Sequence, residues 1–145
     1  MKANFHIFNS KEDLTQSFSN TIIEKLEHAI ETKDKAVLLV SGGNTPKVLF
    51  EKLRTYDIAW EKVVISLVDE RWVNEKHEDS NAKLVKENLL KDKVSKATFI
   101  PLYQEYSEAF DSVDICSELV KKELFYNVIL ILVTTIIAGF LILKS

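Results

Sequence analysis

Cysteine, proline and glycine are scarce in this chain of 145 residues, which contains one, two and three of them respectively. A single cysteine excludes an internal disulfide and a metal site built from several thiolates. The three histidines lack metal-ligand spacing, so we expect no metal. Because two of the three glycines are adjacent, at Gly42 and Gly43, the sequence predicts an unusual backbone conformation there.

A strong excess of positive charge is also missing. The net charge is −3, and no basic cluster with interleaved aromatic residues occurs, so we expect no nucleic-acid partner. Charged residues make up 28% and hydrophobic residues 46%, which is typical of a globular domain. The N-terminus has no basic-then-apolar secretory signal, and we therefore expect a cytoplasmic protein.

Charge disappears near residue 125. Residues 1–124 hold all 22 acidic residues and all but one of the 19 basic residues, and no charge occurs from Phe125 to Leu143. Taken alone, this apolar stretch predicts a transmembrane helix. We therefore expect an α/β domain over 1–124 and an apolar tail over 125–145, with a membrane partner only if the tail is genuine.

Short apolar runs alternate with helical periodicity along residues 1–124. Strands are expected at 5–8, 36–40, 63–68 and 97–100, and helices at 11–31, from 46, from 80 and from 107. Ser10 and Ser80 are candidate helix caps. This alternation predicts a doubly wound, mostly parallel sheet with flanking helices, a Rossmann-like fold in which ligands bind beyond the carboxyl ends of the strands.

Apolar side chains predict the inward faces of two helices. In the helix from residue 46, we expect Val48, Leu49 and Leu53 to point into the core. In the helix from residue 107, the apolar stripe includes Cys116, which favours a buried, inert thiol over a nucleophile.

A glycine-containing loop directly follows the apolar strand 36–40. Ser41–Pro46 (SGGNTP) combines two glycines with Thr45 as a candidate N-cap and Pro46 at the first helical position. Free backbone N–H groups in such a loop suit an anion, and phosphate is the natural ligand. An ordinary strand-to-helix turn is the alternative.

A second polar loop follows the strand 63–68. Its first residues, Asp69, Glu70 and Arg71, must be paired, hydrated or turned toward a ligand, because burying an unpaired charge is unfavourable. Arg71 is suited to bidentate hydrogen bonds with phosphate, and Asp69 could orient Arg71 or accept from a sugar hydroxyl or water. A local Asp69–Arg71 ion pair is the structural alternative. The segment 77–81 is either polar lining or a solvated loop with a helix cap.

These two loops, with Trp60 and the segment from His77 to Asn81, give the chain a strong resemblance to the 6-phosphogluconolactonases of the glucosamine-6-phosphate isomerase superfamily, over about residues 5–124. The resemblance implies a cofactor-free hydrolase that opens 6-phosphoglucono-1,5-lactone, a phosphorylated sugar lactone, in the oxidative pentose phosphate pathway. It implies a supporting role for Asp69 in catalysis. It also implies phosphate binding by Ser41, Gly42, Gly43, Asn44, Thr45 and Arg71.

The family's Gly-x-Gly-x-Asp-Gly-His loop, which carries its general base, has no counterpart in the sequence. Residues 125–130 lie where the family has a strand, and apolar residues 131–140 then replace the expected loop. We expect a frameshift or truncation near this point and impaired catalysis. A genuine membrane anchor, and a buried strand followed by a short apolar helix, are the alternatives. His77 is a weak candidate for a replacement base.

Two other functions remain open. One is an aminosugar-phosphate isomerase or deaminase of the same superfamily, which the Asp69–Arg71 loop disfavours. The other is a phosphosugar-binding protein, or membrane-tethered remnant, that binds through residues 41–46 and Arg71 without turnover.

Overall fold

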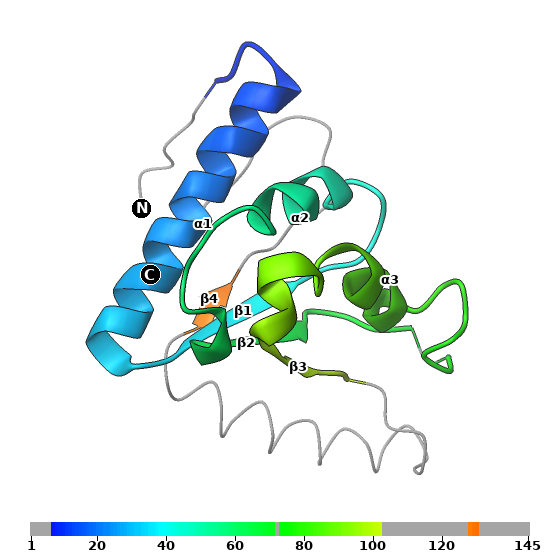
Figure 1. Cartoon of the computed structure of the whole chain (residues 1–145). Helices are drawn as coiled ribbons and strands as arrows, with labels where there is room; N and C mark the ends of the chain where they lie inside the picture. Colours follow the sequence, from blue (N-terminus) through cyan, green and yellow to red (C-terminus); the bar gives the residue numbers. More distant parts are fainter. Residues whose placement is uncertain (1–6, 72, 103–127, 131–145) are drawn as a thin grey trace, which may run out of the picture.

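The computed structural model describes residues 7–71, 73–102 and 128–130 (Figure 1). Its four strands form one parallel sheet in the order β3-β2-β1-β4. The elements are α1 (Lys11–Lys33), β1 (Ala36–Val40), α2 (Lys47–Leu53), η1 (Trp60–Lys62), β2 (Val63–Leu67), α3 (Asn81–Asn88), η2 (Asp92–Lys96), β3 (Thr98–Ile100) and β4 (Val128–Leu130), where η marks a 3₁₀ helix. The predicted parallel α/β sheet with flanking helices is confirmed.

The two central strands end side by side. Val40 is paired with Leu67 in the β1–β2 ladder, and the N–H of Val68 donates to the carbonyl of Val40 at 2.9 Å. The loop after β1 and the loop after β2 therefore leave the same edge of the sheet from neighbouring positions. This is the edge at which the parallel fold predicts a ligand site.

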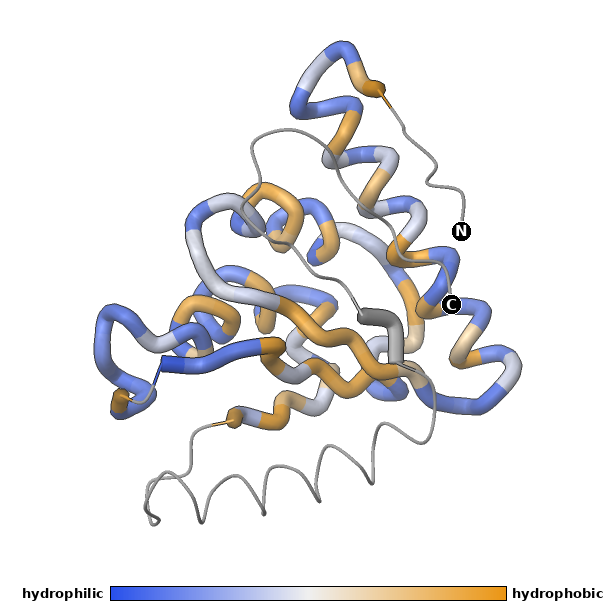
Figure 2. The backbone as a smooth tube through the Cα atoms, turned by 180° about the vertical axis from the view of Figure 1, so that it is seen from behind, coloured by the Kyte–Doolittle hydropathy of each residue, from blue (hydrophilic) through white to orange (hydrophobic). Residues whose placement is uncertain are grey.

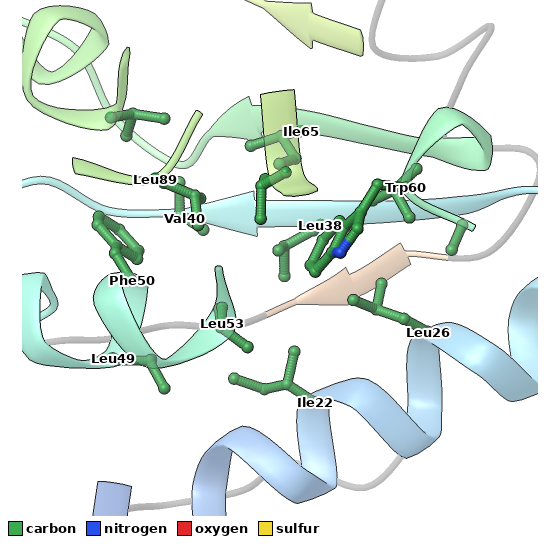
Figure 3. Close-up of a cluster of buried hydrophobic side chains, with 14 of the residues drawn as sticks. Ile22, Leu26, Leu38, Val40, Leu49, Phe50, Leu53, Trp60, Ile65 and Leu89 are labelled. Carbon is green, nitrogen blue, oxygen red and sulfur yellow. The ribbon is translucent and has the colours of Figure 1, made fainter. Parts of the chain in front are cut away.

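One hydrophobic cluster joins the described helices to one face of the sheet (Figure 3). Alternate residues of β1 and β2 face this cluster, as the twofold period of a strand requires. Its members include Ile22, Leu26, Leu38, Val40, Leu49, Phe50, Leu53, Trp60, Ile65, Val85, Leu89 and Val94. On the opposite face, Val37 and Val64 are also buried. Burial on both faces accounts for the continuous apolar runs of these strands.

The long first helix follows the sequence closely. The Ser10 hydroxyl accepts from the N–H of Asp13 at 3.0 Å and caps α1 as predicted. The helix runs two residues beyond its predicted end at residue 31. It stops at Asp34, whose φ of 62° is left-handed and whose N–H donates to the carbonyl of Ile30. Ile22 and Leu26 anchor it in the core.

The start of α2 differs from the prediction. The helix begins at Lys47, and Pro46 precedes it without any side-chain cap, so Thr45 lies in a turn rather than at the N-cap. Leu49 is buried as expected, but Val48 is 61% exposed. Phe50 takes the inward position instead, because Leu49, Phe50 and Leu53 share one face of the helix and Val48 lies outside it.

Two other predicted elements have different outcomes. Ile7 and Phe8 belong to no strand, so that part of the predicted strand 5–8 is wrong, and residues 5 and 6 lie outside the described residues. The predicted helix from residue 107, with Cys116, also lies outside them.

Strand β4 lies within the apolar segment that begins at residue 125. Val128 pairs with Val37 and Leu130 with Leu39, which places residues 128–130 in the sheet, where the resemblance predicts a strand. Across the ranges that the structure describes, no helix has the length and apolar character needed to cross a bilayer. The division of the chain at residue 125 stays a prediction, because residues 131–145 are not described.

Candidate functional site

Two loops form the candidate site at the carboxyl edge of the sheet. The first is Ser41–Pro46 after β1, and the second runs from Val68 to Ser80 after β2, without residue 72. Figure 2 shows the backbone changing from apolar along the central strands to hydrophilic after β2. The sequence therefore places polar groups at the edge of the sheet where the parallel strands β1 and β2 end.

The two glycines of the first loop meet different requirements. Gly43 has a φ of 97°, a conformation that side chains disfavour, and the space where its side chain would lie is open. A Cβ atom on Gly42 would lie 1.8 Å from Oδ1 of Asn81. The prediction of an unusual backbone at this pair is thus confirmed at Gly43, while Gly42 permits the close approach of Asn81 at the start of α3.

The rest of the first loop is accessible on its outer side. Gly43, Asn44 and Thr45 are exposed, and Ser41 is half-buried. Pro46 is buried and leads into α2. A small anion could therefore reach the backbone of residues 43–45 without displacing core side chains.

The carboxylate of Glu70 binds the first turn of α3. Oε1 accepts from the N–H groups of Arg71 and Asn81 at 2.7 and 2.8 Å, while Oε2 accepts from the N–H of Ala82 at 2.8 Å and from the Ser80 hydroxyl at 3.4 Å. Ser80 also caps the N–H of Lys83 at 3.2 Å. The N–H groups of this helix start are thus satisfied by the Glu70 carboxylate and the Ser80 hydroxyl together.

Asp69 contacts the same helix through a different residue. The side-chain amide of Asn81 donates to the backbone carbonyl of Asp69 at 3.0 Å and to its Oδ2 at 3.2 Å. Asn81 is only 5% exposed, whereas Asp69 is exposed. One carboxylate oxygen of Asp69 is therefore held, and the residue still faces solvent at the edge of the sheet.

Arg71 extends into solvent from the same loop. Among the residues that the structure describes, no ion pair joins Arg71 to Asp69, so the structural alternative of a local pair between them is wrong. Its backbone N–H is fixed by Glu70, which positions the start of the side chain. An anchored, exposed guanidinium at this edge can bind an anion.

His77 faces its own turn rather than the first loop. Its Nδ1 accepts from the N–H of Asp79 at 3.2 Å and lies 3.6 Å from the carboxylate of Asp79. These contacts are those of a solvated turn before a capped helix. They give no support to His77 as a replacement base.

Sequence reasoning missed the roles of Glu70 and Asn81. The need for a partner to each carboxylate was visible in the sequence, but the partner of Glu70 lies about ten residues further along the chain. The Ser80–Asn81 start of a helix was the available signal, since a capped first turn supplies N–H donors for a nearby carboxylate.

The chain is similar to known proteins over most of its length. Residues 9–129 match the family described as glucosamine-6-phosphate isomerases/6-phosphogluconolactonase. The chain is 41% identical over 117 residues to a 6-phosphogluconolactonase of Rhizobium meliloti, covering 81% of this chain and 50% of the relative. It is 40% identical over 109 residues to a 6-phosphogluconolactonase of Mesorhizobium japonicum, covering 75% of this chain and 46% of the relative.

A solved structure agrees with these matches. The crystal structure of a 6-phosphogluconolactonase from Shewanella baltica superimposes with a TM-score of 0.78 at 37% identity, covering 82% of this chain and 51% of that one. The chain thus spans about half the length of the curated relatives it matches. With the match over residues 9–129 and the parallel sheet, these similarities show that the chain belongs to the glucosamine-6-phosphate isomerase/6-phosphogluconolactonase family.

Proposed function

We propose that this chain carries the phosphosugar-binding half of a 6-phosphogluconolactonase, a hydrolase that converts 6-phosphoglucono-1,5-lactone to 6-phosphogluconate. The observation that carries the proposal is the meeting of the glycine loop and the Asp69–Arg71 loop through Asn81 at one edge of the sheet. The relatives named 6-phosphogluconolactonase, at 41% and 40% identity, support the choice of substrate.

The phosphate end of the substrate binds the first loop in this proposal. Backbone N–H groups of the exposed residues 43–45 supply donors, and the open space beside Gly43 admits the ligand. Ser41 and Gly42 shape the start of the loop. Arg71 adds a full positive charge and a planar pair of donors, which suits a phosphate monoester.

The sugar end lies closer to Asp69. One oxygen of Asp69 is fixed by Asn81, and the exposed carboxylate can accept a hydrogen bond from a sugar hydroxyl or from water. Lactone hydrolysis requires water to attack the carbonyl carbon, the ring C–O bond to break, and a base to take the proton of the water. Positioning by Asp69 supports this step, whereas proton removal requires a base that the resemblance places in a later loop.

The proposed reaction needs no cofactor, and its substrate is a soluble metabolite, so we place the protein in the cytoplasm. Neither a nucleic acid nor a membrane is required as a partner. The Asp69–Arg71 loop and the names of the relatives favour the lactonase over an aminosugar-phosphate isomerase.

Calorimetric titration with 6-phosphogluconate tests the binding half of the proposal. We expect the chain to bind 6-phosphogluconate but not gluconate, which lacks the phosphate. Arg71→Ala should weaken binding by about tenfold or more, because charge-assisted hydrogen bonds are lost. Lys91→Ala is the matched control, since Lys91 is an exposed cation directly before η2. Equal affinity for gluconate and 6-phosphogluconate would contradict the proposal.

Lactone hydrolysis is measured separately, by following the acid released from 6-phosphoglucono-1,5-lactone. Binding with hydrolysis above the spontaneous rate supports the full activity. Binding without hydrolysis supports a phosphosugar-binding protein and contradicts the proposed hydrolase activity of this chain.

A further inference from the structure

The side chain of Asn81 lies between the two loops of the candidate site. Its amide nitrogen donates to the carbonyl and to the carboxylate of Asp69, at 3.0 and 3.2 Å. Its amide oxygen occupies the space that a side chain on Gly42 would need, 1.8 Å from the position of a Cβ atom. One side chain, 5% exposed, therefore contacts both loops at once.

The orientation of this amide is fixed by its surroundings. If the amide were reversed, its oxygen would face two oxygens of Asp69 that can only accept, and the N–H donors would lose their partners. Below the side chain, the N–H of Asn81 is held by Glu70 at 2.8 Å, and the Ser80 hydroxyl caps the same helical turn. Asn81 thus has a fixed backbone and a fixed side chain.

These contacts couple the two loops mechanically. If the Asp69 carboxylate shifts, the Asn81 amide nitrogen must move with it or lose the hydrogen bond. If the Asn81 amide oxygen shifts, its packing against Gly42 changes. Since interiors are close-packed, displacement at one end is felt at the other.

We propose that Asn81 is a positioning residue that holds the Asp69 carboxylate and the Gly42 backbone in a fixed relation, and so matches the phosphate end of the site to its sugar end. The link between Gly42 and Asp69 stands on geometry alone. Its consequence for 6-phosphogluconate rests on the proposed function.

The substitution Asn81→Asp tests the link because it keeps the shape and replaces the donor by an acceptor. The new carboxylate would face Asp69 at about 3 Å, where two negative charges repel each other. The pair of carboxylates therefore keeps one shared proton up to a higher pH than a single carboxyl group would. Glu70, which binds the backbone of residue 81, and Arg71, the next residue along, are the other charged groups at this point, and both are unchanged in every variant.

The glycine amides give a readout that does not depend on any ligand. The chain has three glycines, so isotope-labelled glycine gives a simple NMR spectrum. Between about pH 5 and pH 8, we expect the Gly42 signal of Asn81→Asp to move with pH, because the shared proton is lost in this range. Asn88→Asp is the matched control: Asn88 lies on the same helix, and its amide bonds the carbonyl of Leu84 at 2.7 Å. In Asn88→Asp, the Gly42 signal should show the same pH dependence as in the unmodified chain.

Binding of 6-phosphogluconate gives the second readout. Relative to the unmodified chain at each pH, Asn81→Asp should lose about tenfold in affinity at the high end of the range and recover at the low end. A purely structural defect would weaken binding equally at both ends. If Asn81→Asp does not fold, Asp69→Asn replaces it, and the Gly42 signal should then move although residue 69 lies on the other loop.

The outcomes separate the two proposals. A Gly42 signal that behaves alike in Asn81→Asp and Asn88→Asp, or that is unmoved by Asp69→Asn, overturns the link. Equal loss of affinity at both pH values overturns the positioning role. A responsive Gly42 in a chain that binds no 6-phosphogluconate supports the link and overturns the proposed function instead.

Discussion

Gly42 and Gly43 are adjacent, yet different forces keep each of them a glycine. Gly43 is required by its backbone, because a φ of 97° strains any residue with a side chain. Gly42 is required by its neighbour, because the amide of Asn81 fills the space beside it. The two effects are separable by substitution, since only one of them depends on another residue.

We predict that Gly42→Ala and Gly43→Ala destabilise the chain through these separate causes. Overpacking at Gly42 should lower the free energy of unfolding by about 1–3 kcal/mol. The strained backbone at Gly43 should lower it by about 1–2 kcal/mol. Adding Asn81→Ala should relieve most of the loss at Gly42 and none of the loss at Gly43. Urea denaturation of the single and double variants measures both couplings, and an equal effect of Asn81→Ala on the two would contradict the packing argument.

The carboxylates after β2 show how far sequence reasoning reaches at this scale. Buried charge needs a partner, so the sequence predicts that Asp69 and Glu70 are satisfied. It does not say which carboxylate binds the helix and which faces the site, because that choice depends on where the first turn of α3 folds back. Only the structure assigns Glu70 to the helix and leaves Asp69 at the surface.

At the scale of elements, the N-terminus of α3 depends on Glu70. We predict that Glu70→Gln lowers the free energy of unfolding by about 1–3 kcal/mol, because an amide nitrogen then faces backbone donors in place of an acceptor. Glu75→Gln is the control, since Glu75 is in the same loop and makes a surface ion pair with Lys86. Glu75→Gln should lower the free energy of unfolding by less than about 1 kcal/mol. Equal losses in thermal or urea unfolding would show that the Glu70 contacts contribute little.

The end of α1 is joined to η1 by an ion pair between Asp34 and Lys62. The hydrogen bond and the charge of Asp34 raise the pKa of Lys62 above its ordinary value of 10.5. Because the pKa is raised in the folded state, the stabilisation is complete below 10.5 and is lost as the pH rises through the folded value.

We predict that Asp34→Asn returns the pKa of Lys62 toward 10.5, while the left-handed turn at residue 34 persists because asparagine tolerates it. NMR titration of the lysine side chain measures the shift. Asp57→Asn, which removes the carboxylate beside Lys93, is the control and should leave Lys62 unchanged. A pKa of Lys62 that stays raised in Asp34→Asn would point to another cause.

Helix starts differ in how well the sequence predicts them. Ser10 and Ser80 cap α1 and α3 as expected, because in each case the serine hydroxyl reaches the N–H three residues later. Thr45 and Pro46 fit the same pattern but fail, because the loop turns once more before α2 begins at Lys47. A cap is therefore predictable where the chain enters a helix directly, and less so where a tight turn intervenes.

At the scale of the whole molecule, the central strands were the most predictable part. Their apolar runs are long enough to be buried on both faces, and each was located to within a residue. The site followed from them, because loops after neighbouring parallel strands must meet at one edge. The contact that joins the loops was not predictable, since Asn81 reaches them from a helix whose position depends on tertiary packing.

The described helices and the central strands share one hydrophobic cluster, so a single core deletion should weaken the whole molecule. We predict that Phe50→Ala, at a fully buried position of α2, lowers the free energy of unfolding by about 3–5 kcal/mol. Val48→Ala, two residues earlier and 61% exposed, should change it by less than about 0.5 kcal/mol. Circular dichroism reports the helices. The fluorescence of the buried Trp60 reports the core beside the sheet, and it is measured in a Trp72→Phe background because the chain has two tryptophans. If the core is one cooperative unit, both signals should shift together in Phe50→Ala, whereas a shift in circular dichroism alone would show that α2 unfolds separately.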